Sequence, residues 1–415
     1  MRIVYVDGFK IRNLTGDMGF NVLHGPKISW YSPWFIPEGE LWIERLVKDE
    51  TKSLIKAEFL EKKLYEKTGD YWMARRKIAK MLCKKSGKNC VLKKFKKRDL
   101  TVRVVDGGIV RQTLDPSFVA GGHGLIYPWY IPKNEIWLDG KLDSRELKYI
   151  LAHEELEYRL MKKGQGYNKA HEAACVVEKE LRAENGIAYY PKTNPTEPLP
   201  FIQIRGGRKK VLITSGIHGD EPSGPYAIAK FLLKEKLLQK IKQKLSADII
   251  PLINPEGFRR RKRKNGKNQD INRYFFDKSR KNEPKEAKTL KKFFRNVKEP
   301  YDLMISLHED PGRKNFYLYD TQNGKNSEIV ENIFRVVKKH GIRLYTGLDS
   351  QAWKNKIQNG YVEVKPKSGL PTLEECLSRN GKVKKALTLE IPGRFVLDKK
   401  INLVIEILET ILLKP

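Results

Sequence analysis

The chain has 415 residues, of which 40% are hydrophobic, and it carries a formal net charge of +32 at pH 7. This length predicts two or three domains, and the hydrophobic content is sufficient for ordinary globular cores. No apolar run approaches the length of a membrane-spanning helix, and residues 1–7 lack the continuous apolar stretch of a signal peptide, so we expect a cytoplasmic protein without membrane contact.

The first half of the chain contains an internal duplication. The string PWFIP at residues 33–37 returns as PWYIP at residues 128–132. Each copy continues into a stretch with the apolar spacing of two consecutive helices. We therefore predict two α+β modules of the same fold, at residues 1–95 and 96–190.

The helical pair of the second module carries a cluster of potential metal ligands. Its first helix contains the string HEELE, in which His153 and Glu157 lie four residues apart on one face. The HEELE string resembles the helix motif of zinc hydrolases with the second histidine replaced by glutamate. An antiparallel second helix would bring His171 opposite His153 and Glu157. The equivalent positions of the first module hold Ala57 and Arg75, so such a pair forms without histidines too. A second metal site and a structural His–Glu pairing both stay open, and we favour the structural one.

Residues 191–200 separate the duplicated half from the rest of the chain. Four prolines occur in these ten residues, and proline prevents helix formation and breaks strand pairing. We predict a semi-rigid extended linker here, followed by a catalytic domain at residues 201–415.

Three apolar runs in the second half are typical of buried strands. They cover residues 211–217, 303–307 and 386–389. His218, His308 and Glu390 follow them directly, at the strand ends where open α/β sheets bind ligands. Glu221 lies three residues after His218 in a strand-to-helix turn, so both side chains can reach one ion. The pattern indicates a hydrolytic zinc site with three protein ligands, an open position for water and Glu390 as general base.

Five short motifs occur in this half in a specific order. They are HGDE at residues 218–221, NPEG at 254–257, DINR at 270–273, SLH at 306–308 and TLE at 388–390. They resemble the motifs of the M14 zinc carboxypeptidase family in its broad sense, which includes the aspartoacylase and succinylglutamate desuccinylase branch. The resemblance implies one zinc ion held by His218, Glu221 and His308, with Glu390 as general base and proton shuttle. It also implies an α/β fold, in which a carboxypeptidase-like mixed sheet flanked by helices follows the two α+β modules.

The resemblance further implies residues that contact the substrate. Asn272 and Arg273 match the pair that grips the free carboxylate of the substrate, and Arg263 resembles the arginine that polarises the scissile carbonyl. A guanidinium suits both roles, because its fork matches a carboxylate and its charge stabilises an oxyanion. Tyr361 is the nearest candidate for the substrate-contacting tyrosine of the family, although it lies farther before the catalytic acid than the family pattern requires.

We therefore predict a zinc-dependent metallocarboxypeptidase that hydrolyses a C-terminal peptide bond or a related amide in a peptide or acyl amino acid with a free carboxylate. Two alternatives stay open: an N-acyl amino acid deacylase of the same fold, and a basic protein whose N-terminal modules bind nucleic acid or a protein partner. The basic runs at residues 84–98 and 259–267 favour non-specific polyanion binding or acidic substrates. Glu374 or Glu375 would instead favour a basic terminal residue if either lines the pocket.

Overall fold

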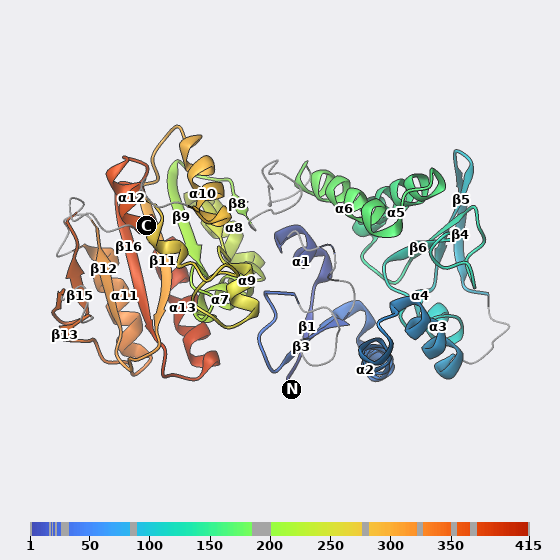
Figure 1. The fold of residues 1–415 in the computed structure, drawn as a ribbon, viewed down its shortest axis with the longest axis horizontal. Coiled ribbons are helices and arrows are strands. Elements are labelled where there is room, and N and C mark those ends of the chain that lie inside the picture. The colour runs from blue at the N-terminus through green and yellow to red at the C-terminus, as the bar shows by residue number, and fades with distance from the viewer. Residues whose placement is uncertain are drawn as a thin grey trace. The chain divides into compact units, whose positions relative to one another are not determined.

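The computed structural model describes residues 2–15, 18, 20, 23–25, 33–83, 89–184, 201–275, 282–321, 327–349, 355–365 and 372–413. Its contacts divide the chain into two compact units, Met1–Tyr190 and Pro191–Pro415 (Figure 1). The predicted proline-rich linker at residues 191–200 lies outside the described residues. Both units combine helices with sheets, and the α/β class predicted from the sequence is confirmed.

The C-terminal unit is built on a seven-stranded mixed sheet with the strand order β15-β12-β16-β11-β9-β10-β8. Its strands are β8 (Ile202–Ile204), β9 (Lys209–Ser215), β10 (Leu245–Ile250), β11 (Leu303–Asp310), β12 (Tyr317–Asp320), β15 (Tyr361–Glu363) and β16 (Ala386–Pro392). The four central strands β16, β11, β9 and β10 run parallel, whereas β8 and β12 are antiparallel to their central neighbours. Aliphatic sequences such as VLITS in β9 suit strands that are buried on both faces.

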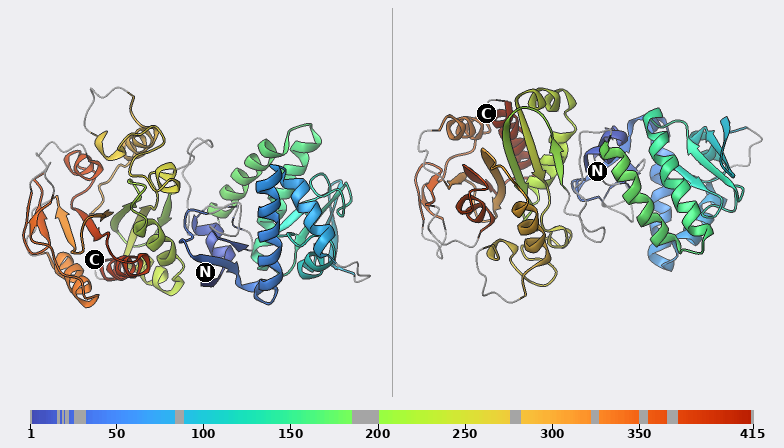
Figure 2. Two further views of the ribbon diagram at one scale, coloured as in Figure 1. Left: turned by 60° about the horizontal axis from the view of Figure 1, so that its bottom comes forward. Right: turned by 90° about the horizontal axis from the view of Figure 1, so that it is seen from above.

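Helices cover both faces of this sheet (Figure 2). They are α7 (Ser223–Leu232), α8 (Glu235–Lys244), α9 (Pro255–Arg259), η3 (Ile271–Arg273), α10 (Lys285–Arg295), α11 (Glu328–Lys339), α12 (Leu373–Arg379) and α13 (Leu397–Leu413), and a small hairpin joins β13 (Gly347–Leu348) to β14 (Lys356–Ile357). Helix α13 packs against α7, α8 and α11. Helices α10 and α12 share a different core with the register partners Leu212, Met304 and Ala386. Because side chains alternate along a strand, His308 and Glu390 face this second side as well.

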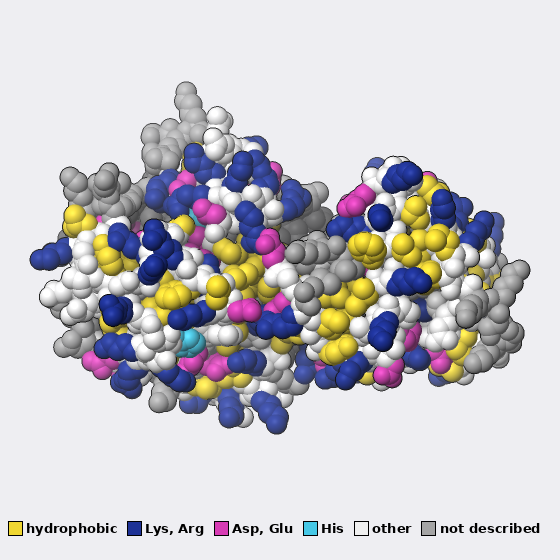
Figure 3. Space-filling model, turned by 90° about the horizontal axis from the view of Figure 1, so that it is seen from below, with side chains coloured by type: hydrophobic (Ala, Val, Ile, Leu, Met, Phe, Trp, Pro, Cys, Tyr) yellow, Lys and Arg dark blue, Asp and Glu magenta, His cyan; other side chains and the backbone are white. Residues whose placement is uncertain are grey.

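Basic side chains dominate the charged surface. Figure 3 shows Lys and Arg spread over the visible face of both units, with fewer Asp and Glu between them. This distribution agrees with a chain that has 82 Lys and Arg residues against 50 Asp and Glu. Among the described residues, no helix is long and apolar enough to cross a membrane.

The two halves of the N-terminal unit have the same order of elements. The first half comprises β1 (Arg2–Val6), α1 (Gly8–Thr15), β2 (Leu23–His24), β3 (Glu40–Glu44), η1 (Arg45–Glu50), α2 (Thr51–Thr68) and α3 (Tyr71–Leu82). The second comprises β4 (Val91–Lys97), β5 (Leu100–Val105), α4 (Gly107–Thr113), β6 (Gly121–His123), β7 (Glu135–Asp139), η2 (Ser144–Glu146), α5 (Leu147–Lys162) and α6 (Tyr167–Glu184). In the first half, β1 pairs parallel and β2 antiparallel with β3. In the second half, β5 pairs parallel and β6 antiparallel with β7. Strand β4 adds an antiparallel edge strand beside β5.

Local sequence signals explain where the paired helices begin and end. Helix α2 stops at Gly69, which has a left-handed φ of 67° that glycine adopts without strain. Helix α3 then starts at Asp70, whose carboxylate accepts a hydrogen bond from the backbone N–H of Met73 at 2.9 Å. In the second half, α5 and α6 match the two helices that the apolar spacing predicted.

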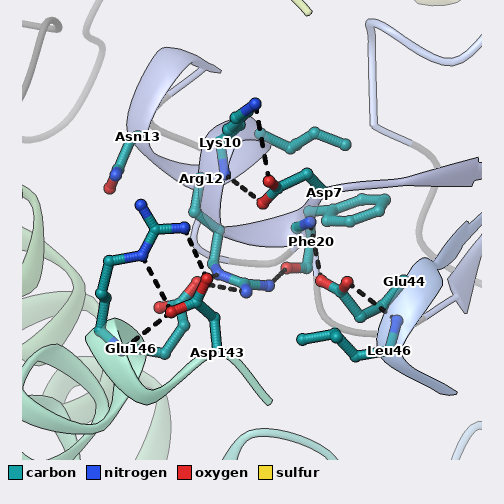
Figure 4. Close-up of polar contacts among 12 residues, drawn as sticks. Asp7, Lys10, Arg12, Asn13, Phe20, Glu44, Leu46, Asp143 and Glu146 are labelled. Atoms are coloured by element: carbon teal, nitrogen blue, oxygen red, sulfur yellow. Dashed lines mark hydrogen bonds and ion pairs between the residues drawn. The ribbon is translucent and has the colours of Figure 1, made fainter.

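Buried arginine–glutamate pairs join the two halves of the N-terminal unit. Arg12 on α1 donates from Nε to Oε1 of Glu146 in the second half at 2.8 Å, and from a terminal nitrogen to the carbonyl of Phe20 at 2.6 Å (Figure 4). Arg111 on α4 donates from Nε to Oε2 of Glu50 in the first half at 2.7 Å. The arginine of each half thus bonds to a glutamate of the other half, as in a two-fold symmetric interface.

A common hydrophobic core completes the N-terminal unit. It contains Leu41 and Ile43 from the first half together with Ile136 and Leu138 from the second. The halves predicted as separate modules at residues 1–95 and 96–190 thus form one compact unit, because each sheet is too small to bury its apolar face alone.

Candidate metal centre

Three neighbouring parallel strands bring the candidate residues of the C-terminal unit together. His308 on β11 and Glu390 on β16 are partners in register, and β9 on the other side of β11 leads to His218. The sequence placed His308 and Glu390 just after their strands, whereas β11 continues to Asp310 and β16 to Pro392. Since register partners present their side chains on the same face, the sheet itself holds the histidine beside the acid.

The turn between β9 and α7 carries His218 and Glu221. Gly216 has a left-handed φ of 62° directly after the strand. A Cβ atom on Gly219 would lie only 2.0 Å from the carbonyl carbon of Gly257, so this position requires glycine for the close approach of two backbone segments. The HGDE and NPEG motifs therefore fold against each other.

His218, Glu221 and His308 converge in the interior of the unit. His218 Nδ1 lies 2.6 Å from Glu221 Oε1, and His308 Nδ1 lies 3.0 Å from Glu221 Oε2. All three residues are buried, and the two imidazole centroids are 5.0 Å apart. Two imidazole nitrogens and a carboxylate at one point form a donor set that zinc prefers. Glu221 Oε2 is buried without a hydrogen bond of normal geometry, which suits an atom that binds an ion, so these residues fit zinc.

A carboxylate lies behind each histidine. His218 Nε2 is 3.3 Å from Asp270 Oδ1, and His308 Nε2 is 3.3 Å from Glu374 Oε1. The hydrogen bond of Glu374 fixes the tautomer of His308 and turns its Nδ1 away from Glu374, whereas Asp270 lies at ion-pair distance from His218 Nε2 without hydrogen-bond geometry. Glu374 also accepts a hydrogen bond from Ser306 Oγ at 2.6 Å, so it holds the site from behind. Sequence reasoning gave neither acid this role, although Asp270 opens the DINR motif.

The charges of the site depend on one another. Burial lowers the pKa of His218 and His308, but the nearby carboxylates, Glu221 for both and Asp270 or Glu374 for one each, together outweigh burial and raise the pKa of both above 6.5. Burial also raises the pKa of Glu390, to about 7. The neighbouring carboxylates of Glu221 and Asp310 raise this pKa further, whereas the two histidines lower it. A carboxyl group with a pKa near neutrality can both take and return a proton at physiological pH.

The site opens into a cavity of about 280 Å³, whose lining includes Glu390 and two arginines. Arg263 donates from Nε to Asp270 Oδ2 at 3.1 Å, and another of its nitrogens lies 3.6 Å from Glu221 Oε1. Arg273 donates to the backbone carbonyl of Asn272 at 2.9 Å. The structure thus brings both predicted arginines to the cavity wall.

Asn272 lies at the cavity but is engaged by the protein. Its Oδ1 accepts a hydrogen bond from the backbone N–H of Leu373 at 2.8 Å, and its Nδ2 lies 3.5 Å from Glu374 Oε2. The side chain is buried. In this arrangement, Asn272 anchors the start of α12.

Tyr361 does not line the cavity. It belongs to β15, and its hydroxyl donates to Asp320 Oδ2 at 3.2 Å. Among the described residues, the tyrosines that line the cavity are Tyr317 and Tyr319 on β12, and Tyr317 is the register partner of Glu390. The choice of Tyr361 is therefore corrected, because the antiparallel pairing of β12 with β16 decides which tyrosine faces the acid.

The HEELE cluster lies in the N-terminal unit, and the structure brings its three predicted residues together. His153 Nε2 is 3.1 Å from His171 Nδ1, which in turn is 2.6 Å from Glu157 Oε2. Sequence reasoning missed His123, whose Nε2 is 3.1 Å from Glu157 Oε1, and Glu178, which lies 2.9 Å from His153 Nδ1. His24-Gly25 of the first half returns as His123-Gly124 in the second half, and this repeated pair was the available sequence signal for His123.

Comparison with known proteins shows that much of the C-terminal unit is similar to a known family. Residues 207–365 match the family model of the succinylglutamate desuccinylase/aspartoacylase catalytic domain. A segment of 68 residues is 38% identical to carboxypeptidase SOL1 of Arabidopsis thaliana, which is 15% of this chain and 14% of that protein. The C-terminal half is accordingly similar to the M14 zinc carboxypeptidases in the broad sense, as its motifs predicted.

Several solved structures are similar to the C-terminal unit at low identity. A candidate metallopeptidase from Shewanella amazonensis is 20% identical with a TM-score of 0.45, over 54% of this chain and 85% of that one. A metallo-carboxypeptidase from Burkholderia cenocepacia is 13% identical with a TM-score of 0.39, over 52% and 60% of the two chains. A succinylglutamate desuccinylase from Silicibacter sp. TM1040 is 17% identical with a TM-score of 0.38, over 52% and 60%.

Proposed function

We propose that the C-terminal unit is a zinc-dependent hydrolase that cleaves a C-terminal peptide bond, or a related amide, next to a free carboxylate. The observation that carries this proposal is the approach of His218 Nδ1 and His308 Nδ1 to the two oxygens of Glu221, with Glu390 in register beside His308. A zinc ion held by these three ligands would polarise the scissile carbonyl and lower the pKa of water toward ~7.

Glu390 moves the proton in this proposal. Its carboxyl group lines the cavity and has a pKa raised to about 7 by burial, so the ionised form can accept a proton from the attacking water. The same group then returns that proton to the leaving amine. One residue thus serves both halves of the reaction, and it regains its starting state when the products leave.

The arginines of the cavity wall recognise negative charge. Arg273 presents a guanidinium fork that can hold the free carboxylate of the substrate by two hydrogen bonds. Arg263 has a nitrogen 3.6 Å from Glu221 Oε1, so it lies near the place where a carbonyl oxygen would gain charge. Together they favour a substrate whose scissile amide lies one residue from its carboxyl terminus.

Two substrate classes satisfy this arrangement. The similarity to carboxypeptidase SOL1 supports a peptide with a free C-terminus, whereas the match of residues 207–365 to the desuccinylase and aspartoacylase domain supports an N-acyl amino acid. In both classes, hydrolysis releases an amino acid whose carboxylate was free in the substrate. We favour the peptide class and keep the N-acyl amino acid as the second candidate.

Parallel assays on both substrate classes test the proposal. N-terminally blocked peptides and N-acyl amino acids are incubated with the wild type, with Glu390→Gln and with chelator-treated protein, and released amino acid is measured. We expect the wild type to hydrolyse one class, Glu390→Gln to lose about 10²–10⁴-fold in rate while it keeps its zinc, and added zinc to restore the treated protein. Full activity in Glu390→Gln, or in protein without metal, would contradict the proposal.

A further inference from the structure

A second convergence of ligand atoms lies inside the N-terminal unit. It borders a cavity of about 540 Å³ between the two halves of that unit. His153 and Glu157 stand one turn apart on α5, and His171 faces them from α6, which packs along α5. These residues are separate from the C-terminal site, and the proposed hydrolase activity does not use them.

Three atoms of this cluster form a triangle of the size that one ion requires. His153 Nε2 lies 3.1 Å from His171 Nδ1 and 3.5 Å from Glu157 Oε2, and the third side, from His171 Nδ1 to Glu157 Oε2, is 2.6 Å. Ligands at bonds of ~2.0–2.1 Å in a tetrahedral zinc site are about 3.3 Å apart. The imidazole centroids of His153 and His171 are 4.9 Å apart, close to the 5.0 Å between His218 and His308.

Two further contacts orient the ligand atoms. His153 Nδ1 lies 2.9 Å from Glu178 Oε2, so Nδ1 carries the proton and the lone pair of Nε2 points at His171 and Glu157. His123 Nδ1 accepts a hydrogen bond from the backbone N–H of Leu125 at 3.3 Å, and its Nε2 therefore donates to Glu157 Oε1 at 3.1 Å. His123 thus fixes one oxygen of Glu157 and leaves the other directed at the two histidines.

Arginine compensates only part of the negative charge of the cluster: Arg182 Nε donates to Glu178 Oε1, behind His153, at 2.9 Å. In the part of the chain that the structure describes, no Lys or Arg forms an ion pair with Glu154 or Glu157, although both are buried. Glu154 Oε2, at 9% residue exposure, has no hydrogen-bond partner and borders the cavity. Buried carboxylates require a compensating cation, and three histidines supply one only by taking up protons.

The first half of the unit has a different side chain near the equivalent buried glutamate. There Glu61 replaces Glu157, Ala57 replaces His153 and Arg75 replaces His171. Burial raises the pKa of Glu61, and the nearby guanidinium of Arg75 opposes that rise. Arg75, whose Nε donates to Asp115 Oδ2 at 2.9 Å, therefore supplies a fixed cation near Glu61, whereas among the described residues no Lys or Arg forms an ion pair with Glu157.

We propose that His153 Nε2, His171 Nδ1 and Glu157 Oε2 form a second metal site, which binds one divalent ion of the zinc class in place of the guanidinium of the first half. His123 and Glu178 orient the ligands. Three protein ligands leave a coordination position for water or a small molecule, and Glu154, which lies one turn before His123's partner Glu157, also lines the cavity. Cys175 lies close enough to both histidines to form an alternative ligand group with them, but its Sγ contacts His171 Nε2 at 3.6 Å, whereas Glu157 contacts His171 Nδ1.

Metal counting on the full chain tests the second site. Each protein is equilibrated with a zinc buffer, passed over a desalting column and analysed for bound zinc. We expect two equivalents in the wild type, one in His218→Ala, one in His153→Ala or His171→Ala, and none in a variant that combines the changes of the two sites. His171 is the safer position, because its side chain is 41% exposed and its loss disturbs packing less.

Matched variants separate metal binding from folding. Glu58→Gln, the equivalent of Glu154 in the first half, and Cys175→Ser should both keep two equivalents. In the His218→Ala background, bound cobalt should give a visible ligand-field absorption that His171→Ala abolishes while circular dichroism stays native. The site is overturned if the wild type binds a single equivalent that His218→Ala removes, or if the second equivalent survives both histidine changes. The first of these results would leave the hydrolase proposal intact.

Discussion

Two acids, Asp270 and Glu374, lie behind the histidines of the C-terminal site. Each carboxylate lies 3.3 Å from an Nε2 atom, so Nδ1 of both rings points at Glu221. Burial raises the pKa of Glu374, but its contacts with His308 and Ser306 outweigh burial and lower that pKa to about 2. Glu374 therefore remains ionised behind His308 at neutral pH, and it is a positioning residue for the site.

Replacing Glu374 with glutamine should weaken zinc binding at the C-terminal site. The amide keeps the shape of the side chain but lacks the charge that strengthens the bond from the imidazole N–H, and the loss of such an outer contact typically costs 10–100-fold in metal affinity. Competition with a chromophoric chelator measures this change. Glu363→Gln on the exposed end of β15 should leave the affinity unaltered. Equal affinities for the wild type and Glu374→Gln would remove this role.

Glu390 gives the metal-free protein a defined pH dependence. Its folded-state pKa is raised from 4.5 to about 7, so its contribution to stability is complete below pH 4.5 and is lost as the pH rises through 7. Glu390→Gln keeps the neutral form and should raise the free energy of unfolding of chelator-treated protein by roughly 1–3 kcal/mol near pH 8. Urea titrations should show this gain shrinking toward about pH 5. A gain that is the same at both pH values would contradict the raised pKa.

At the scale of elements, the reciprocal pairs across the N-terminal unit hold its two halves in register. Arg111 on α4 donates to Glu50 after β3 and, at 2.6 Å, to Asp139 at the end of β7. Asp139 is fully buried. A single guanidinium therefore neutralises two acids from different halves, and the equivalent Arg12 bonds to Glu146 on the other side of the pseudo-symmetric interface.

Arg111→Met should destabilise the N-terminal unit strongly. It leaves Asp139 buried without its cation, and loss of one partner of a buried ion pair costs about 3–5 kcal/mol. Urea unfolding followed by circular dichroism measures the effect. Adding Asp139→Asn removes the orphaned charge and should recover part of the loss, whereas a double variant less stable than the sum of the two single changes would contradict this account.

Some of this architecture could be predicted from the sequence, for physical reasons. Aliphatic runs are typical of buried strands, so these strands could be predicted. His218 and Glu221 lie within one turn of chain, so local spacing was sufficient to predict that they share a site. Tyr317 escaped prediction because it reaches Glu390 through antiparallel strand pairing across 73 residues of chain, which no local pattern encodes. The shared core of the N-terminal halves escaped as well, since a duplication reveals equal folds but not how two copies bury their apolar faces together.

At the scale of the whole molecule, the net charge of +32 predicts affinity for polyanions. The basic run at residues 259–267 contributes Arg263 to the wall of the C-terminal cavity, so we expect the same surface to attract anionic substrates and nucleic acid. Attraction of this kind requires no sequence recognition. We also expect it to leave the proposed metal site intact, because His218, Glu221 and His308 are buried.

Nucleic acid binding should be weak, non-specific and steeply dependent on salt. Because binding releases condensed counterions, the logarithm of the association constant should fall linearly with the logarithm of the salt concentration. Fluorescence anisotropy with labelled oligonucleotides of different sequence measures this dependence, and His218→Ala should bind equally well. Tight, sequence-dependent binding that persists at high salt would instead support the alternative of a dedicated binding protein.

The location of the metal tests the central claim most directly. Crystals of the full chain grown with zinc should be measured on both sides of the zinc absorption edge, so that an anomalous difference map identifies the element and its position. The account predicts a peak in contact with His218 Nδ1, His308 Nδ1 and the Glu221 carboxylate. A zinc-loaded crystal without a peak there, or with the ion bound through the Nε2 atoms that face Asp270 and Glu374, would contradict it.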